Sequence, residues 1–492
     1  MSVTTSDAVA LAQEAGSLFE QGRGTQAAGV MAKALVLDPN NTRFNVDMGH
    51  ILVRIGDLQG GLAYARRAKE IGRLTIPGWN TVAYIATTAG DHRLAHQIYS
   101  RLLKVEEKTP ALCSRLGSTH LFFGEVDKAV EYYDQAIALD PGYAMAYWLR
   151  SGARRATNDQ NTLDQLQEAL ASHVKVADEH YLRFALFKEL EDLGEYDQAF
   201  GELKLGCPLV RKTTPYDAGT DRALFDAIIR YCDTAFLQGS NESYSSDEPI
   251  YILGMPRTGT TLIDRVLEFY PQIASAGETY AVRSAIKHAL KAPLEAPFTP
   301  AMIQAWPTMD LARVGELSVQ MTQPLTGHTA HYIDKFPPNF LYLGVMAKAL
   351  PNCRIVHLTR NPMDTCFSNL KQLFAPGIFP HSYDQQNMTN YYLLYRQLMA
   401  HWCEQLGDRI LHVDYDKFVG DPRSEAQRLV AHCGLVWDER CLQIEQRNTA
   451  VATASMAQVR EPIYQSSRER WRCYERHLQP MREQLQACVT PA

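Results

Sequence analysis

The chain has 492 residues, a length that favours two or three domains over one core. Its composition is 46% hydrophobic and 21% charged, and because no apolar run is long enough to cross a bilayer, we expect no membrane span. The formal net charge of −6 argues against a general nucleic-acid binder, since phosphate contacts need a surplus of Lys and Arg. The N-terminus lacks the basic residues and apolar block of a secretory signal, so we expect a cytoplasmic protein.

A period of 34 residues runs through the first part of the chain. Gly22, Gly56, Gly90 and Gly124 are each 34 apart (56−22, 90−56 and 124−90), and the next step falls on Asn158. Asn is the residue type that best replaces Gly at positive φ. Small residues recur five positions after each of these glycines, as Ala27, Gly61, Ala95 and Ala129. Glycine lets the chain turn between helices and small residues let helices approach closely, so the pattern predicts an array of helix pairs.

The repeated units resemble a known family. Asp38-Pro39 and Asp140-Pro141 lie three periods apart, and the stretch GEVDKAVEYYDQAIALDPGYAMAY contains a whole unit. Together these features resemble the tetratricopeptide repeat over roughly residues 8 to 205. The resemblance implies a curved all-α solenoid whose concave face suits a peptide or a partner protein. A purely structural role, as a cap on the second domain, stays open beside that interpretation.

The hydrophobic pattern changes near residue 240. Residues 217–238 predict one more amphipathic helix, and the stretch GSNESYSSDEP that follows gathers turn-forming residues. We therefore expect two domains, residues 1–240 and residues 248–492. In the second, the apolar runs PIYILG, HYIDK, RIVHLTR and ILHVDYD each precede a helical pattern. Short strands alternating with helices predict an α/β fold with a parallel sheet and ligands at the carboxyl ends of its strands.

The first strand leads into a phosphate-binding loop. The stretch from Gly254 to Thr261, GMPRTGTT, has two glycines five apart before a helix. Thr260 stands where a nucleoside-triphosphate loop needs Lys, and the positive charge is Arg257 instead. Backbone N–H groups at the start of a helix, with the hydroxyls of Thr258, Thr260 and Thr261, still form a cradle for an anion. The loop therefore suits an anionic ester and lacks the lysine of Mg²⁺-ATP chemistry.

A second anion subsite is expected at the end of another strand. Arg360 ends the strand RIVHLT, Asn361 and Pro362 can cap and open the next helix, and Ser368 follows on that helix. An arginine at this edge is placed to form a two-pronged contact with a phosphate.

These motifs resemble those of sulfotransferases. GMPRTGTTLIDRVLEFYPQI is similar to their 5′-phosphosulfate loop and RIVHLTRNPMDTCFSNL to their 3′-phosphate motif, and the likeness extends over roughly residues 249 to 475. It is closer to the Golgi-type and protein-tyrosine enzymes than to the cytosolic ones, which carry Lys-Thr-x-His where this chain has Asp334-Lys335-Phe336-Pro337. The resemblance implies a P-loop-like fold, 3′-phosphoadenylyl sulfate (PAPS) as donor, a hydroxyl-bearing acceptor and no metal.

The resemblance also implies roles for single residues. The donor would be bound by Arg257, Thr258, Gly259, Thr260, Thr261, Arg360, Ser368, Tyr415, Ser455 and Arg470, the last replacing a Lys of the relatives. Lys335 matches the basic residue near the leaving oxygen, and Glu278 matches the carboxylate that deprotonates the acceptor. Arg257 would also take part in catalysis. Sulfuryl transfer follows an in-line path through a loose transition state, so positioning and charge neutralisation can suffice without a metal.

Other functions are also compatible with parts of this pattern. A P-loop kinase is disfavoured by Thr260, and a catalytically inactive repeat scaffold is disfavoured because the set Arg257, Lys335, Arg360 and Ser368 is complete. Glu278 could serve only as a helix cap or in a loop salt bridge. The acceptor stays open between a peptide tyrosine, a saccharide and a small alcohol, and the repeats could bind either that acceptor or a partner protein.

Overall fold

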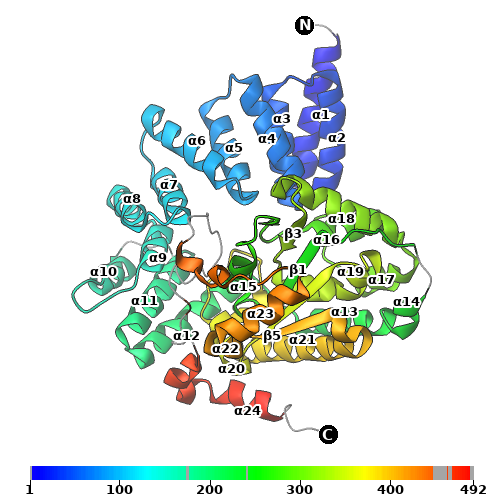
Figure 1. Cartoon of the computed structure of the whole chain (residues 1–492). Helices are drawn as coiled ribbons and strands as arrows, with labels where there is room; N and C mark the ends of the chain where they lie inside the picture. Colours follow the sequence, from blue (N-terminus) through cyan, green and yellow to red (C-terminus); the bar gives the residue numbers. More distant parts are fainter. Residues whose placement is uncertain are drawn as a thin grey trace.

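The computed structural model describes residues 3–172, 175, 177–239, 242–446, 463 and 468–487. Figure 1 shows helices α1 to α12 curving over the top and left of a second region built around a sheet. The helices of this array are α1 (Val3–Glu20), α2 (Gly24–Leu37), α3 (Thr42–Ile55), α4 (Leu58–Ile71), α5 (Ile76–Thr88), α6 (His92–Val105), α7 (Pro110–Phe122), α8 (Val126–Leu139), α9 (Ala144–Ala153), α10 (Leu163–Ser172), α11 (Glu179–Leu193) and α12 (Tyr196–Thr213).

The turns of the array follow the glycine period. Gly56 ends α3 with a φ of 96°, and the equivalent glycines at 22, 90 and 124 also have positive φ. Gly194, between α11 and α12, has the same conformation at 84°. The expectation for Asn158 is wrong, because its φ is not positive. Helix α9 ends early, at Ala153, and a loop with a bridge between Thr157 and Gln160 replaces the tight turn.

The connection to the second region consists of two helices where one was predicted. They are α13 (Ala218–Tyr231) and α14 (Thr234–Gln238). The interruption falls at Asp233, whose side chain caps α14 by accepting a hydrogen bond from the backbone N–H of Phe236. A competing N-cap therefore explains the break.

The second region contains a five-stranded parallel sheet with the order β2-β3-β1-β4-β5. Its strands are β1 (Pro249–Gly254), β2 (Ile273–Ser275), β3 (His331–Asp334), β4 (Arg354–Thr359) and β5 (Ile410–Asp414). The central strand β1 pairs with β3 through Ile250↔Ile333 and with β4 through Gly254↔Leu358. All carboxyl ends therefore meet at one edge, and the predicted fold class is confirmed.

Helices cover both faces of the sheet. The α-helices of this region are α15 (Thr260–Leu267), α16 (Ala281–Ala289), α17 (Pro300–Gln304), α18 (Leu311–Thr326), α19 (Leu343–Ala349), α20 (Pro362–Leu370), α21 (Gln385–Leu406), α22 (Tyr415–Gly420), α23 (Pro422–His432) and α24 (Gln479–Ala487). The described 3₁₀ helices are η1 (Trp306–Thr308), η2 (Pro337–Tyr342), η3 (Pro380–Tyr383), η4 (Gly407–Arg409), η5 (Glu439–Leu442), η6 (Ile444–Gln446) and η8 (Arg470–His477).

Alternate residues of the buried strand β1 face two different hydrophobic clusters. Ile250 and Ile252 pack with α15, α22 and α23, whereas Tyr251 and Leu253 pack with α16, α18, α19, α20 and α21. This second cluster also includes array residues such as Phe187 and Phe200. Because one core spans both parts of the chain, the division into residues 1–240 and 248–492 stays a prediction.

The array contacts the sheet region at both of its ends. At the first end, Thr25 on α2 donates its hydroxyl proton to Glu295 at 2.5 Å, and Leu294 belongs to the cluster formed by α1, α2 and α3. At the other end, Glu191 on α11 forms an ion pair with Lys371 at 2.7 Å. Among the described residues, no helix is both long and apolar enough to span a membrane.

Candidate functional site

The loop between β1 and α15 depends on two glycines with unusual backbone conformations. Gly254 has a φ of 148°, and a Cβ there would lie 2.5 Å from the carbonyl oxygen of Leu358. Gly259 has a φ of 98°, and a Cβ there would lie 2.4 Å from the ring of Tyr415. Arg257, between them, also has a positive φ, of 69°. Only glycine fits the two outer positions, so the backbone is folded into a tight loop at the start of α15.

The three threonines of this loop are buried. Thr258 is 2% exposed, and its hydroxyl donates a hydrogen bond to the carbonyl oxygen of Met255 at 2.8 Å. This hydrogen bond stabilises the loop itself. Thr260 and Thr261 are the first two residues of α15, where the helix dipole favours an anion.

Arg360 and Tyr415 lie beside this loop. Arg360 follows β4, the neighbour of β1, and its guanidinium donates a hydrogen bond to the carbonyl oxygen of Arg257 at 3.2 Å. The same guanidinium lies 4.9 Å from the centre of the Tyr415 ring, at the end of β5. Three strand ends thus bring together residues up to 158 positions apart in the sequence, since 415 − 257 is 158.

Helix α20 packs against the glycine loop and is hydrogen-bonded to it. Asn361 caps α20 by accepting hydrogen bonds from the N–H groups of Met363 and Asp364. Asn369 donates a hydrogen bond to the carbonyl oxygen of Pro256, inside the loop, at 2.8 Å. Ser368, the preceding residue, is half-buried on the same helix. The Asn361 cap therefore already uses the N–H groups of Met363 and Asp364 at the start of α20.

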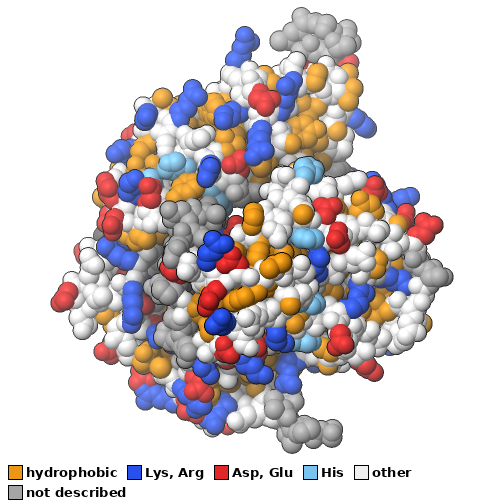
Figure 2. Space-filling model, viewed as in Figure 1, with side chains coloured by type: hydrophobic (Ala, Val, Ile, Leu, Met, Phe, Trp, Pro, Cys, Tyr) orange, Lys and Arg blue, Asp and Glu red, His pale blue; other side chains and the backbone are white. Residues whose placement is uncertain are grey.

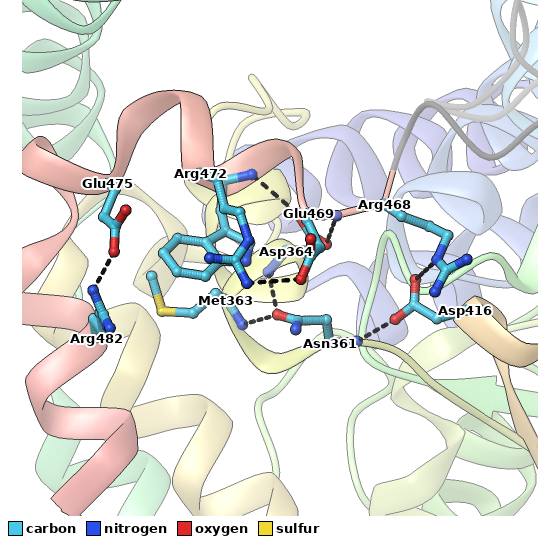
Figure 3. A network of polar contacts seen from close by, with 10 residues as sticks. Asn361, Met363, Asp364, Asp416, Arg468, Glu469, Arg472, Glu475 and Arg482 are labelled. Carbon is cyan, nitrogen blue, oxygen red and sulfur yellow. Dashed lines mark hydrogen bonds and ion pairs between the residues drawn. The ribbon is translucent and has the colours of Figure 1, made fainter.

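The C-terminal segment is fixed over the start of α20, as Figure 3 shows. Asp364 accepts hydrogen bonds from the backbone N–H of Glu469 at 2.7 Å and of Trp471 at 3.1 Å. Asp416 accepts one from the N–H of Asn361 and lies 3.8 Å from Arg468. Sequence reasoning missed both aspartates, although each follows closely on a predicted strand end.

The structure places Arg470 on the side of α20 that faces the array. Its Nε lies 4.0 Å from Oε1 of Glu191, and its guanidinium lies 5.9 Å from the ring centre of Tyr196. Within the described part of the chain, Arg470 forms no hydrogen bond or ion pair with the loop residues. Ser455 lies outside the described residues.

Lys335 and Glu278 form an ion pair at the carboxyl end of β3. Lys335 is 1% exposed and its Nζ lies 2.5 Å from Oε1 of Glu278, whose side chain is 47% exposed. The backbone N–H of Lys335 donates to the carbonyl oxygen of Gly277 at 2.9 Å, which aligns the two segments. The predicted catalytic pair is therefore in contact, with the lysine below and the carboxylate towards solvent.

Two buried carboxyl groups adjoin this pair. Burial raises the pKa of Asp264, on α15, to about 6, although the nearby charge of Lys335 opposes the shift. Burial likewise raises the pKa of Asp334 to about 7, opposed by hydrogen bonds from Thr279 at 2.7 Å and Asn339 at 3.3 Å. No role was predicted for either carboxyl group: Asp264 lies inside a helix without a distinctive motif, and Asp334 was named only as the neighbour of Lys335.

A cavity of about 950 Å³ opens above Glu278 and Lys335. One wall comes from the sheet region and includes Thr261 and Asp264, whereas the other comes from the array and includes Arg54, Tyr84 and His92. The 34-residue period predicted the array but not which of its residues face the sheet edge. Lys and Arg side chains mix with Asp and Glu over the face drawn in Figure 2, without one extended field of a single sign.

Within the described ranges, His, Cys, Asp and Glu side chains nowhere gather in threes at a suitable spacing for a metal ion.

Comparisons with known proteins give a match in each of the two regions. Residues 249–439 match the model of a sulfotransferase family, and residues 110–143 match that of a tetratricopeptide repeat. Both resemblances predicted from the motifs are confirmed.

Individual relatives cover only parts of the chain. An uncharacterized protein of Aquifex aeolicus is 30% identical over 375 residues, 74% of this chain and 48% of that protein. Protein-tyrosine sulfotransferase A of Caenorhabditis elegans is 23% identical over 212 residues, 42% of this chain and 55% of that one. The chain thus spans about half the length of these relatives. The sulfotransferase domain of the Synechococcus PCC 7002 olefin synthase is 19% identical with a TM-score of 0.34, covering 48% of this chain and 91% of that domain.

Proposed function

We propose that this chain, whose residues 249–439 carry the signature of the sulfotransferase family, transfers a sulfuryl group from PAPS to a hydroxyl group of an acceptor. One observation supports the proposal above others. The glycine loop with Arg257, the arginine at the end of β4 and the Lys335–Glu278 pair all lie at the carboxyl edge of one parallel sheet. Two anion subsites and an acid–base pair are what this transfer requires.

The donor would be held by the residues around the loop. The backbone at Gly259 packs closely against the Tyr415 ring, which keeps the loop tightly folded, and Thr260 and Thr261 add hydroxyl donors at the start of α15. Arg360 and Ser368 would take the 3′-phosphate, with Tyr415 beneath the guanidinium. Bound PAPS supplies the activated sulfuryl group. Arg470 and Ser455 remain proposed donor contacts on the strength of the family resemblance.

The chemical step would use the ion pair at the end of β3. The buried side chain of Lys335 can neutralise charge on the leaving phosphate, because the attraction between opposite charges is stronger where water is excluded. Glu278 is more exposed and lines the cavity, so it can take the proton of an entering hydroxyl. The 2.5 Å contact between them holds both groups together at the carboxyl end of β3.

The acceptor would bind in the cavity between the sheet edge and the array. Its volume of about 950 Å³ exceeds what a small alcohol fills, which favours a peptide or a saccharide. Arg54 and Tyr84 belong to the repeats, so we propose that the array presents the acceptor to Glu278 rather than only capping the fold.

Calorimetry with the product nucleotide 3′,5′-ADP tests the donor site. Binding should persist in a chelator, because arginine, lysine and hydroxyl donors replace a metal in this proposal. Mass spectrometry of candidate peptides and saccharides incubated with PAPS should then reveal an added sulfate. Absence of nucleotide binding would overturn the proposal, whereas binding without any sulfated product would favour the inactive scaffold.

A further inference from the structure

Glu191 occupies an unusual position for a residue of a repeat array. It lies in the last turn of α11, and its side chain is only 12% exposed. Both carboxylate oxygens accept hydrogen bonds from Nζ of Lys371, at 2.7 and 2.8 Å. The hydroxyl of Tyr474 donates a further hydrogen bond at 3.1 Å, and Nε of Arg470 lies 4.0 Å away. One carboxylate of the array thus contacts two separate segments of the sheet region.

Both segments lead directly to the proposed donor site. Lys371 follows α20, the helix that carries Ser368 and whose Asn369 binds the carbonyl oxygen of Pro256 in the glycine loop. Arg470 and Tyr474 belong to η8, which Asp364 fixes over the start of the same helix, as seen in Figure 3. The position of α20 relative to the array therefore depends on Glu191.

Glu191 also balances the positive charges around it. Burial lowers the pKa of Lys371, and the nearby charges of Arg470 and Arg257 lower it further, whereas the charge of Glu191 opposes the shift. Burial alone would raise the pKa of Glu191, but the charge of Lys371 holds it below its ordinary value. The carboxylate is therefore ionised and is the counter-charge of a cationic group. Without it, like charges would repel one another beside the place where a phosphate should bind.

We propose that Glu191 is a positioning residue of the donor site, supplied by the repeat array. It fixes the end of α20 through Lys371 and holds Arg470 beside that helix, and so sets the affinity for the nucleotide. This inference rests on the proposed function, because the site that it positions is the PAPS site. It also makes the array part of donor binding, in addition to its proposed role with the acceptor.

The test compares two single variants of the full chain. Glu191→Gln should weaken 3′,5′-ADP binding by about tenfold or more, the usual loss when a charge-assisted contact is removed. Asp197→Asn is the matched control, because Asp197 on α12 also binds the C-terminal segment, through His477 at 2.7 Å, but does not contact α20. Its affinity for 3′,5′-ADP should equal that of the wild type.

A double variant separates positioning from stability. Glu191→Gln alone leaves Lys371 buried without its partner and should lower the melting temperature, whereas Glu191→Gln with Lys371→Met removes both charges and should recover it. If Glu191 positions Arg470, the double variant still binds 3′,5′-ADP weakly, and acceptor KM at saturating donor stays near that of the wild type. Recovery of affinity together with melting temperature would overturn the inference, as would a single variant that binds like the wild type. Failure of the wild type to bind 3′,5′-ADP would instead overturn the proposed function.

Discussion

At the scale of single residues, the contact between Lys335 and Glu278 supports two roles for the carboxylate. Glu278 neutralises a buried ammonium, and it also lines the cavity where a hydroxyl would enter. A counter-ion alone would act through the leaving group, whereas a base acts on the acceptor. The two roles predict different responses to the acidity of the acceptor.

Glu278→Gln keeps the size of the side chain and removes the base. Turnover with a weakly acidic acceptor should fall by about 10² to 10⁴-fold, the usual contribution of a positioned base, with donor affinity nearly unchanged. An acidic phenol ionises unaided and should partly rescue Glu278→Gln but not Lys335→Ala. Rates would be measured with a series of acceptors of graded acidity. Equal turnover of wild type and Glu278→Gln on the weakest acid would return Glu278 to a structural role.

Asp334 makes stability depend on pH. Its folded pKa, raised by burial to about 7, lies above the ordinary value of 3.8, so the folded state binds the proton more tightly than the unfolded chain. This contribution to stability is fully present below the ordinary value and is lost as pH rises through about 7. The melting temperature of the wild type minus that of Asp334→Asn should therefore be larger at pH 5 than at pH 8. A difference that is constant across this range would contradict the prediction.

At the scale of elements, the glycine loop is where sequence and structure agree best. The spacing of Gly254 and Gly259, the strand before them and the helix after them were all predicted, because a tight loop at a strand end needs a fixed local pattern. Arg360 followed from the same reasoning. Local chemistry at strand ends is thus readable from the sequence.

Gly259→Ala tests whether this loop must approach a ligand. The added Cβ would collide with the ring of Tyr415, at a residue whose φ is 98°. We expect a loss of about 1 to 3 kcal/mol in unfolding free energy and at least tenfold weaker 3′,5′-ADP binding. Gly327→Ala is the control, because its φ of 66° imposes similar strain but no atom lies within 4 Å of the added Cβ. Equal nucleotide affinity for both variants would argue against a ligand at the loop.

Other features could not be predicted, and the reasons are physical. The prediction of a tight turn at Asn158 was wrong, because the 34-residue period indicates where a repeat should turn but not that α9 ends early, at Ala153. The partners of Glu191 lie 180 or more positions away, since 371 − 191 is 180, and no local pattern encodes a contact of that range. The cavity wall formed by Arg54 and Tyr84 was missed for the same reason. Long-range packing determined these parts of the candidate site.

At the scale of the whole molecule, the array and the sheet region form one arch that is joined near both ends of the array. Thr25 and Glu295 connect them near the first repeat, and Glu191 and Lys371 connect them near the last. The cavity lies between these two points, so its width depends on both.

Thr25→Val removes the hydroxyl that binds Glu295 and accepts from the N–H of Leu294, without altering a residue that lines the cavity. If the array forms an acceptor wall, acceptor KM should rise by about three- to tenfold, because the wall shifts, while the Kd for 3′,5′-ADP stays constant. Glu295→Gln weakens the same contact from the opposite side and should raise acceptor KM as well, although Glu295 itself lines the cavity. Steady-state kinetics of both variants give the comparison. An effect seen only with Glu295→Gln would indicate a local change rather than movement of the array.

The two contacts also restrict how the repeats can change in number. A solenoid with a free end can gain or lose a unit at modest cost, since each repeat packs only on its neighbours. Here one 34-residue unit more or fewer between Thr25 and Glu191 would move one contact away from its partner, because both partners belong to the same sheet region. The count of repeats is therefore fixed by closure, as the number of strands is in a barrel, and the array behaves as a span of set length rather than as an extendable rod.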